Sequence, residues 1–174
     1  TQLLRSGGTV NHTPAEIDRL LDNKAISLSI NSSTLTASAY MSFLSADTDQ
    51  ALTILNEVLR YPRFDEDALQ RAKIGMNTSI SRRNDNVEDI AFREFHKLVY
   101  GADNPFARHT EYSTIANITK EDIISFHKDH FIPHNTYISI VGNFDSHQMK
   151  DKISNIFGDW AFENTLPEIV YDKD

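Results

Sequence analysis

The chain has 174 residues, a formal net charge of −8 and no cysteine. This length is enough for one domain with its own core. The negative charge argues against a nucleic-acid partner, because such sites need clustered lysine and arginine. The absence of cysteine excludes disulfides and thiolate metal sites. No apolar run reaches the ~18 residues of a membrane span, so we expect a soluble protein, periplasmic or cytoplasmic if it is bacterial.

The first third of the chain predicts two helices and a hairpin. Residues 2–5 have the pattern of a helix end that the glycine pair 7–8 closes. Residues 13–16, Thr-Pro-Ala-Glu, form a capping box that begins the next helix. Apolar residues then alternate over 26–30 and again over 35–43, the period of a half-buried strand. These two runs predict an antiparallel hairpin with one face on a core.

Three helices are predicted in the middle of the chain. Asp47 is a candidate cap for the first, which Pro62 ends. The second begins near Asp65 and is interrupted at 84–86, Asn-Asp-Asn. Apolar residues at helical spacing over 90–99 indicate a third helix with a buried face.

The last part of the chain predicts two helices around a short strand. A capping box at Thr119 begins a helix that Pro133 ends, and residues 137–141 form an apolar run that predicts a strand. A final helix begins at Asp145. We therefore expect one domain over residues 1–160 and a linker or tail over 161–174 that leads toward a second domain.

The summed pattern predicts an α+β fold, a mostly antiparallel sheet covered by several helices. Only three clear strands accompany about seven helical segments. Such a sheet is thin for so much helix, which indicates that strands outside this piece complete it.

Three histidines are the best metal candidates by spacing. His127, His130 and His134 follow one another at i, i+3 and i+7, and three imidazoles on one helical face could bind zinc. Pro133 breaks the helix before the third of them, and phenylalanines beside them have the character of a core. Packing or capping at a helix end is therefore the favoured interpretation, and no metal site is predicted.

The remaining polar residues do not indicate catalysis. His96 and His109 are isolated in the sequence, and a triad cannot be identified from scattered residues. The pair Arg82–Arg83 is better explained as a solvated helix end than as an anion site. No catalytic residue is predicted, and the substrate-binding residues stay unknown.

Several short motifs, taken together and in order, resemble the first homologous half of the pitrilysin/insulinase-type zinc metallopeptidases, which include the mitochondrial processing peptidases. The similarity spans roughly residues 3–160. The motifs are Leu4-Arg5-Ser6-Gly7-Gly8-Thr9, Phe64-Asp65-Glu66, Arg93-Glu94-Phe95, Leu98-Val99-Tyr100-Gly101, Pro105-Phe106-Ala107-Arg108, Ile118-Thr119-Lys120-Glu121-Asp122, Phe126-His127, Pro133-His134-Asn135 and Val141-Gly142-Asn143-Phe144-Asp145.

The resemblance implies a fold and a chemistry. Two such domains form one half of a clamshell that encloses unfolded peptides. Active members bind zinc through His-x-x-Glu-His on an early helix and through a glutamate on a later one. The resemblance also implies that the family's first strands precede Leu3, so that the domain is truncated at its N-terminus in this chain.

The sequence departs from the family pattern at both parts of the zinc site. No His-x-x-Glu-His occurs, and the second histidine would fall near residues 1–3, where there is none. Counted from Phe64, the later acidic pair falls on Thr78 and Ser79. Neither hydroxyl replaces a carboxylate ligand, so no cofactor is predicted for this chain, although active members of the family hold zinc.

Three functional hypotheses follow. The first is a non-catalytic homologue that acts as a structural or peptide-embracing partner in proteolysis. The second is a fragment of an active zinc metalloendopeptidase, and the third is an unrelated α+β binding module. The partners expected for the first are a catalytic homologous subunit or second domain, and a peptide substrate. An exposed sheet edge also predicts self-association or a strand supplied by a neighbour.

Overall fold

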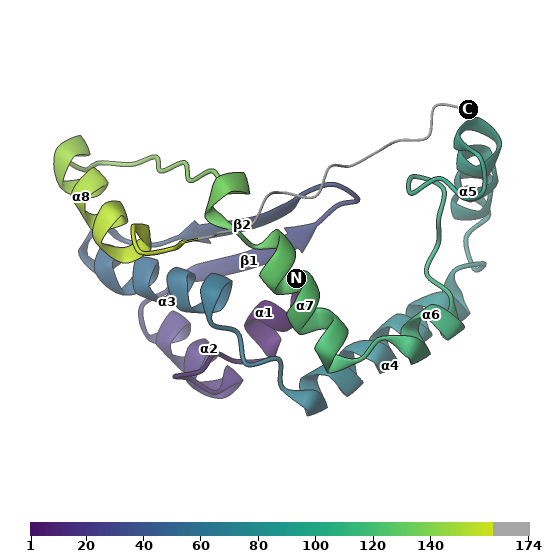
Figure 1. The fold of residues 1–174 in the computed structure, drawn as a ribbon, viewed down its shortest axis with the longest axis horizontal. Helices are drawn as coiled ribbons and strands as arrows, with labels where there is room; N and C mark the ends of the chain where they lie inside the picture. The colour runs from purple at the N-terminus through teal and green to yellow at the C-terminus, as the bar shows by residue number, and fades with distance from the viewer. Residues whose placement is uncertain (162–174) are drawn as a thin grey trace.

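The computed structural model describes residues 1–161 (Figure 1). Within that range the elements follow one another in this order: α1 (Gln2–Ser6), α2 (Pro14–Asn23), β1 (Ser27–Ser32), β2 (Ala37–Ser42), a 3-10 turn (Ser45–Asp47), α3 (Thr48–Arg60), α4 (Glu66–Arg82), α5 (Val87–Tyr100), α6 (Tyr112–Asn117), α7 (Lys120–His130), a second 3-10 turn (Pro133–Asn135) and α8 (Ser146–Phe157). The predicted tail spans 161–174, and all of it after Ala161 lies outside the described residues.

Both capping boxes are confirmed. The hydroxyl of Thr13 accepts a hydrogen bond from the backbone N–H of Glu16, and the Glu16 carboxylate accepts one from the backbone N–H of Thr13 at 2.7 Å. Thr119 and Asp122 repeat this arrangement at the start of α7. The Asp145 carboxylate caps α8 by accepting from two backbone N–H groups of its first turn. Helix starts are local features, which is why the sequence predicts them well.

Two local expectations are wrong. Asp47 precedes α3, but its side chain makes no capping bond and forms an ion pair with Lys24 at 2.8 Å. The short helix α6 has no counterpart in the sequence prediction, because six residues are too few to show a clear helical period.

The predicted α+β class is confirmed, with a small sheet. β1 and β2 pair antiparallel, so that Leu28 lies opposite Met41 and Ile30 opposite Ala39. The predicted strand at 137–141 is wrong, because within residues 1–161 the run makes no ladder with another strand. An apolar run becomes a strand only where a partner lies alongside it.

The core lies between one face of β1 and the helices α1, α2, α3 and the first turn of α4. Its members are buried apolar side chains: Leu3, Leu4, Ile17, Leu21, Ile26, Leu28, Ala51, Ile54, Val58, Phe64, Ala68 and Leu69. The amphipathic spacing that predicted α2 is therefore the spacing of its core-facing residues, Ile17 and Leu21.

A close contact at Gly7 fixes α1 against the start of α4. A β-carbon placed on Gly7 would lie 2.6 Å from the carbonyl oxygen of Leu3 and 3.3 Å from the backbone nitrogen of Asp65. Gly8 follows with a φ of +73°, the left-handed conformation that favours glycine. The glycine pair therefore both ends α1 and lets the chain pass close to α4.

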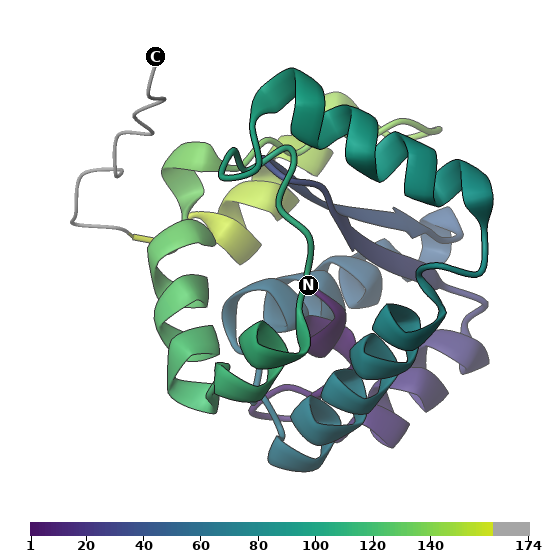
Figure 2. The same cartoon turned by 90° about the vertical axis from the view of Figure 1, so that its right-hand side faces the viewer.

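Helix α5 stands apart from the hairpin in Figure 1, at the far end of α4. Figure 2, seen from that side, shows α5 crossing in front of the hairpin with α4 below it. The helix was predicted with a buried face, and this part of the prediction is wrong: none of its residues is buried, and Leu98 is 85% exposed. The described elements supply no surface that covers it.

No helix within the described range is both long enough and apolar enough to cross a membrane.

Candidate functional site

The positions that match the family's zinc ligands carry no ligand side chains. Gln2 and Leu3 lie on α1, and Leu3 points into the core. Further along α4, the exposed Thr78 and Ser79 each donate a hydrogen bond to a carbonyl oxygen one turn back in their own helix, at 3.0 and 3.1 Å. Each hydroxyl donates to the backbone of its own helix, and neither position offers the carboxylate that the family pattern has there.

The first of the three candidate histidines is part of the packing. The His127 ring stacks on Phe131 with centroids 4.9 Å apart and meets the edge of Phe64 at 5.3 Å. Its Nε2 lies 2.8 Å from the carbonyl oxygen of Leu59, and therefore carries the proton that it donates. Burial lowers the pKa of His127 from its usual 6.5, because the charged ring would lose its hydration.

The structure does not bring the three histidines together as a metal site. The His130 ring packs against Phe126 with centroids 4.4 Å apart, while His134 lies on the 3-10 turn after α7. Within residues 1–161 no group of three histidine, aspartate or glutamate side chains could hold a metal ion. His127 and His130 both pack against phenylalanine rings, in agreement with the packing role that the sequence favoured.

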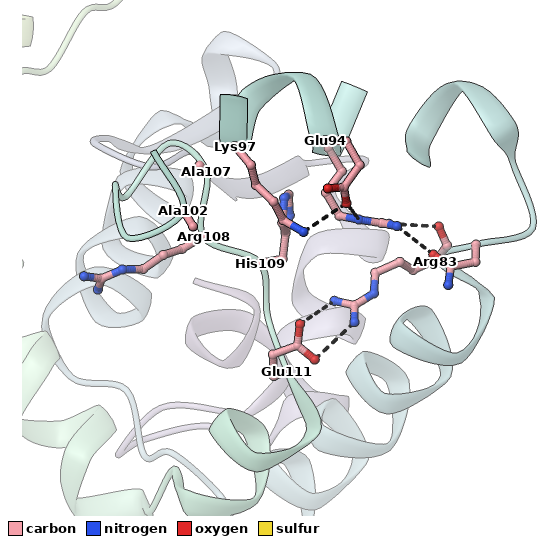
Figure 3. Close-up of a pocket in the computed structure, with 10 residues that line it drawn as sticks. Arg83, Glu94, Lys97, Ala102, Ala107, Arg108, His109 and Glu111 are labelled. Atoms are coloured by element: carbon pink, nitrogen blue, oxygen red, sulfur yellow. Dashed lines mark hydrogen bonds and ion pairs between the residues drawn. The ribbon is translucent and has the colours of Figure 1, made fainter. Parts of the chain in front are cut away.

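A small polar pocket lies where α4, α5 and the loop before α6 meet (Figure 3). It has a volume of about 370 Å³. Residues of the loop line the pocket together with the two helices. The lining residues are Arg83, Asn84, Arg93, Glu94, Lys97, Ala102, Ala107, Arg108, His109 and Glu111.

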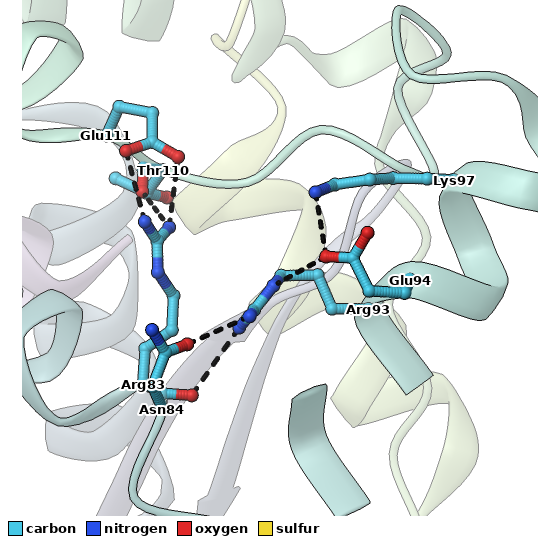
Figure 4. Close-up of polar contacts among 7 residues, drawn as sticks. All are labelled: Arg83, Asn84, Arg93, Glu94, Lys97, Thr110 and Glu111. Atoms are coloured by element: carbon cyan, nitrogen blue, oxygen red, sulfur yellow. Dashed lines mark hydrogen bonds and ion pairs between the residues drawn. The ribbon is translucent and has the colours of Figure 1, made fainter. Parts of the chain in front are cut away.

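One ion pair and one side-chain hydrogen bond join the three segments around this pocket (Figure 4). Arg83 at the end of α4 donates to both carboxylate oxygens of Glu111, each at 3.1 Å. On α5, Lys97 donates to Glu94 at 2.9 Å, and Arg93 donates to the side-chain oxygen of Asn84 at 2.8 Å. Arg93 therefore ties α5 to the residues that follow α4, and Arg83 ties those residues to the loop.

His109 lines the pocket with a buried and unpaired ring nitrogen. Its Nε2 has no hydrogen-bond partner among the described residues. Burial lowers the pKa of His109, and the nearby charges of Lys97, Arg93 and Arg83 lower it further. The imidazole is therefore neutral near pH 7.

The two carboxylates of the pocket have cationic partners. The hydrogen bond from Lys97 lowers the pKa of Glu94, and the hydrogen bonds from Arg83 lower that of Glu111. Both carboxylates are thus ionised, and each accepts hydrogen bonds from a cationic side chain. The arrangement forms a salt-bridged joint between the end of α4 and the loop before α6.

Little in the sequence indicates this joint. Arg83 was interpreted as a solvated helix end and His109 as isolated, whereas both line one pocket. Arg83 and Glu111 are 28 residues apart, and only the path of the intervening loop brings them together. The one local signal was the spacing of Glu94 and Lys97, at i and i+3 on one helix.

Comparison with family models divides the chain into two matches. Residues 2–113 match the model described as Insulinase (Peptidase family M16). Residues 117–174 match the model described as Peptidase M16 inactive domain.

Two proteins with similar sequences point to the same family. The chain is 28% identical over 120 residues to an "Uncharacterized zinc protease" of Rickettsia felis, which covers 68% of this chain and 29% of that protein. It is 33% identical over 73 residues to the "Non-peptidase homolog YmxG" of Helicobacter pylori, covering 42% of this chain and 17% of that protein. The chain therefore spans less than a third of the length of these relatives.

Solved structures share the fold. A peptidase M16 inactive domain from Pseudomonas fluorescens superposes with a TM-score of 0.85 at 22% identity, covering 97% of this chain and 41% of that one. A protease from Helicobacter pylori superposes with a TM-score of 0.81 at 19% identity, covering 96% and 41%. Each of these chains is more than twice as long as the part that matches.

Proposed function

Because the chain belongs to the insulinase family of peptidases, peptidase family M16, we propose that it is a non-catalytic member of that family. In this role it serves as a structural or peptide-embracing half beside a catalytic half. The observation that carries the proposal is the state of Thr78 and Ser79, whose hydroxyls bond to their own helix where the family needs a carboxylate.

The residues present do not fit a catalytic zinc ion. Such an ion needs three protein ligands and an open position for water. The matched stretch at the start of α1 has no histidine, and the matched positions on α4 have no carboxylate. Among the described residues no nearby trio of histidine, aspartate or glutamate compensates.

Two comparisons support the proposal that the chain is a non-catalytic member of the family. The family model that matches residues 117–174 is described as an inactive domain. One relative in Helicobacter pylori is itself named a non-peptidase homolog. Each supports the proposal independently of the residues on α4.

The partner that we propose is a homologous catalytic half, either a second domain or a separate subunit. The chain covers 41% of each of two solved relatives, which leaves room in those proteins for a second unit of this size. A peptide enclosed between the two halves is the substrate class that this arrangement would serve.

The alternative is that the chain forms part of an active zinc metalloendopeptidase. The name of the Rickettsia felis relative favours it. In that case the ligands would come from outside residues 1–161, and Thr78 and Ser79 would have no part in holding the ion.

The test combines metal analysis with a cleavage assay. The purified chain is analysed for zinc and incubated with a quenched-fluorescent unfolded peptide, alone and mixed with a catalytic homologue of the family. We expect far less than one zinc per chain, no cleavage by the chain alone, and a saturable increase in cleavage when it is added to the homologue. One zinc per chain with cleavage that a chelator stops would overturn the proposal, as would a mixture no faster than the homologue alone.

Matched variants separate the α4 position from a general effect. Thr78→Ala removes the hydroxyl from α4, and Thr34→Ala makes the same change in the hairpin turn. Both variants should keep the low zinc content of the unmodified chain. Loss of bound zinc in Thr78→Ala alone would place a ligand on α4 and contradict the proposal.

A further inference from the structure

The polar pocket between α4, α5 and the loop before α6 holds more cations than carboxylates. Its lining includes four cationic side chains and two carboxylates, in a chain whose formal net charge is −8. In Figure 3 the guanidinium of Arg108 points away from the other charged groups, so three cations remain to be balanced by two carboxylates. All ten lining residues lie between positions 83 and 111, so one continuous stretch of the chain builds the whole pocket.

The unbalanced charge lies on α5. Arg83 and Glu111 match each other one to one. Glu94, by contrast, is shared: its Oε1 accepts a hydrogen bond from Lys97 at 2.9 Å and lies 3.5 Å from the Nε of Arg93. The Arg93 side chain is only 15% exposed, so water screens its charge poorly. One positive charge beside Glu94 therefore lacks an anion among the residues that line the pocket.

The pocket also has donors to spare and room for a ligand. A lysine ammonium has three N–H donors, and that of Lys97 has one acceptor, Glu94, among the described residues. The Lys97 side chain is 40% exposed, so a ligand from solution can reach it. The volume of about 370 Å³, against ~30 Å³ for one water molecule, admits a small anion with part of its hydration.

We propose that the pocket binds a small oxyanion, a phosphate or carboxylate group, beside Lys97 and Arg93. Such a group accepts several charge-assisted hydrogen bonds at once, which matches a cluster of nitrogen donors. It would supply the negative charge that Glu94 alone does not. The inference goes beyond the proposed function, since it requires neither a catalytic half nor an enclosed peptide, and it uses no residue outside 83–111.

His109 reports whether the site is occupied. The charged groups that act on its ring come from all three segments: Lys97 and Arg93 on α5, Arg83 at the end of α4 and Glu111 on its own loop. Burial, and then the three cations, lower the pKa of His109. A bound anion offsets the cations and so raises that pKa, and by linkage the anion binds more tightly as the pH falls.

Nuclear magnetic resonance of the histidine rings tests the proposal. The purified chain is titrated with sodium sulfate and, separately, with sodium acetate, while sodium chloride holds the ionic strength constant. Sulfate represents phosphate groups, because its own charge does not change while histidine titrates. We expect saturable shifts of the His109 signals with half-saturation below about 10 mM, and a pKa of His109 that rises by about half a unit or more at saturation. The exposed His147 on α8 is the internal control, and its pKa should stay at the value measured in chloride.

Lysine variants separate binding in the pocket from a general effect of charge. Lys97→Gln removes the exposed cation, and Lys97→Arg keeps the charge. Lys128→Gln makes the neutralising change at an exposed residue of α7. Lys97→Gln should weaken anion binding by about tenfold or more, whereas the other two variants should bind as the unmodified chain does. Circular dichroism checks that each variant is folded.

The two anions identify the source of the oxyanion. Tighter binding of sulfate indicates a phosphate-type ligand, and equal or tighter binding of acetate indicates a carboxylate such as that of a peptide. Three results would overturn the proposal. They are no saturable shift of the His109 signals, shifts that His147 shares or that chloride reproduces, and unchanged affinity in folded Lys97→Gln.

Discussion

Arg83 and Glu111 form a two-pronged ion pair that joins the last turn of α4 to the residue before α6. Both nitrogen–oxygen distances are 3.1 Å, and Arg83 also donates to the carbonyl oxygen of Thr110 at 2.9 Å. A planar guanidinium matches a carboxylate in this two-pronged geometry, so the pair fixes direction as well as distance. Helix α5 has no buried residue, and this joint is a main constraint on the loop that follows it.

Neutralising the carboxylate should loosen the loop. We expect Glu111→Gln to speed amide exchange in residues 102–111, because the carboxylate that pairs with Arg83 loses its charge. Amide exchange in the hairpin should change little. Glu121→Gln removes the same charge from α7 and serves as the control. The pKa of Glu111 is lowered from its usual 4.5 by Arg83. The pair is therefore fully present above pH 4.5, and its contribution is lost as the pH falls through the lowered pKa. Equal exchange in both variants would contradict this role.

Two leucines distinguish the core from the uncovered helix. Leu21 on α2 is 1% exposed and Leu98 on α5 is 85% exposed. Leu21→Ala should lower the free energy of unfolding by about 2–5 kcal/mol, because it leaves a cavity in the core. Leu98→Ala should change it by less than about 0.5 kcal/mol, since the side chain already faces solvent. Urea unfolding measures both values, and a large loss in Leu98→Ala would show that another surface covers α5.

His127 should make stability depend on pH. Burial lowers its pKa in the folded state below the usual 6.5, so the folded state holds fewer protons than the unfolded state. Its contribution is therefore fully present above pH 6.5 and is lost as the pH falls through the lowered pKa. We expect the Tm of the unmodified chain to fall in this window more steeply than that of His127→Gln. His134→Gln, at the exposed turn after α7, is the control, and parallel Tm profiles for the unmodified chain and His127→Gln would refute the assignment.

The elements that the sequence predicted correctly carry their cause within a few residues. Thr13 and Glu16 stand three positions apart and cap each other, and Thr119 and Asp122 do the same. The alternation over 26–30 needs only the facing strand a few residues later. Such features are determined before the chain makes any distant contact.

The features that it missed depend on distant or uncovered surfaces. Residues 137–141 have strand-forming side chains but no strand partner within residues 1–161, so composition alone misled the prediction. Helix α5 has the apolar spacing of a packed helix without a described surface to pack against. The ion pair between Arg83 and Glu111 joins residues 28 positions apart, so it cannot be predicted without knowing the path of the loop.

Gly7 has no side chain, and this lets α1 lie close to the backbone at the start of α4. Any larger residue there would press on the Leu3 carbonyl and on the backbone of Asp65, and so would move α1 relative to α4. The two segments whose family counterparts share an ion are thus held in register by contacts that involve no ligand. The placement of α1 against α4 therefore rests on a backbone contact and not on a bound ion.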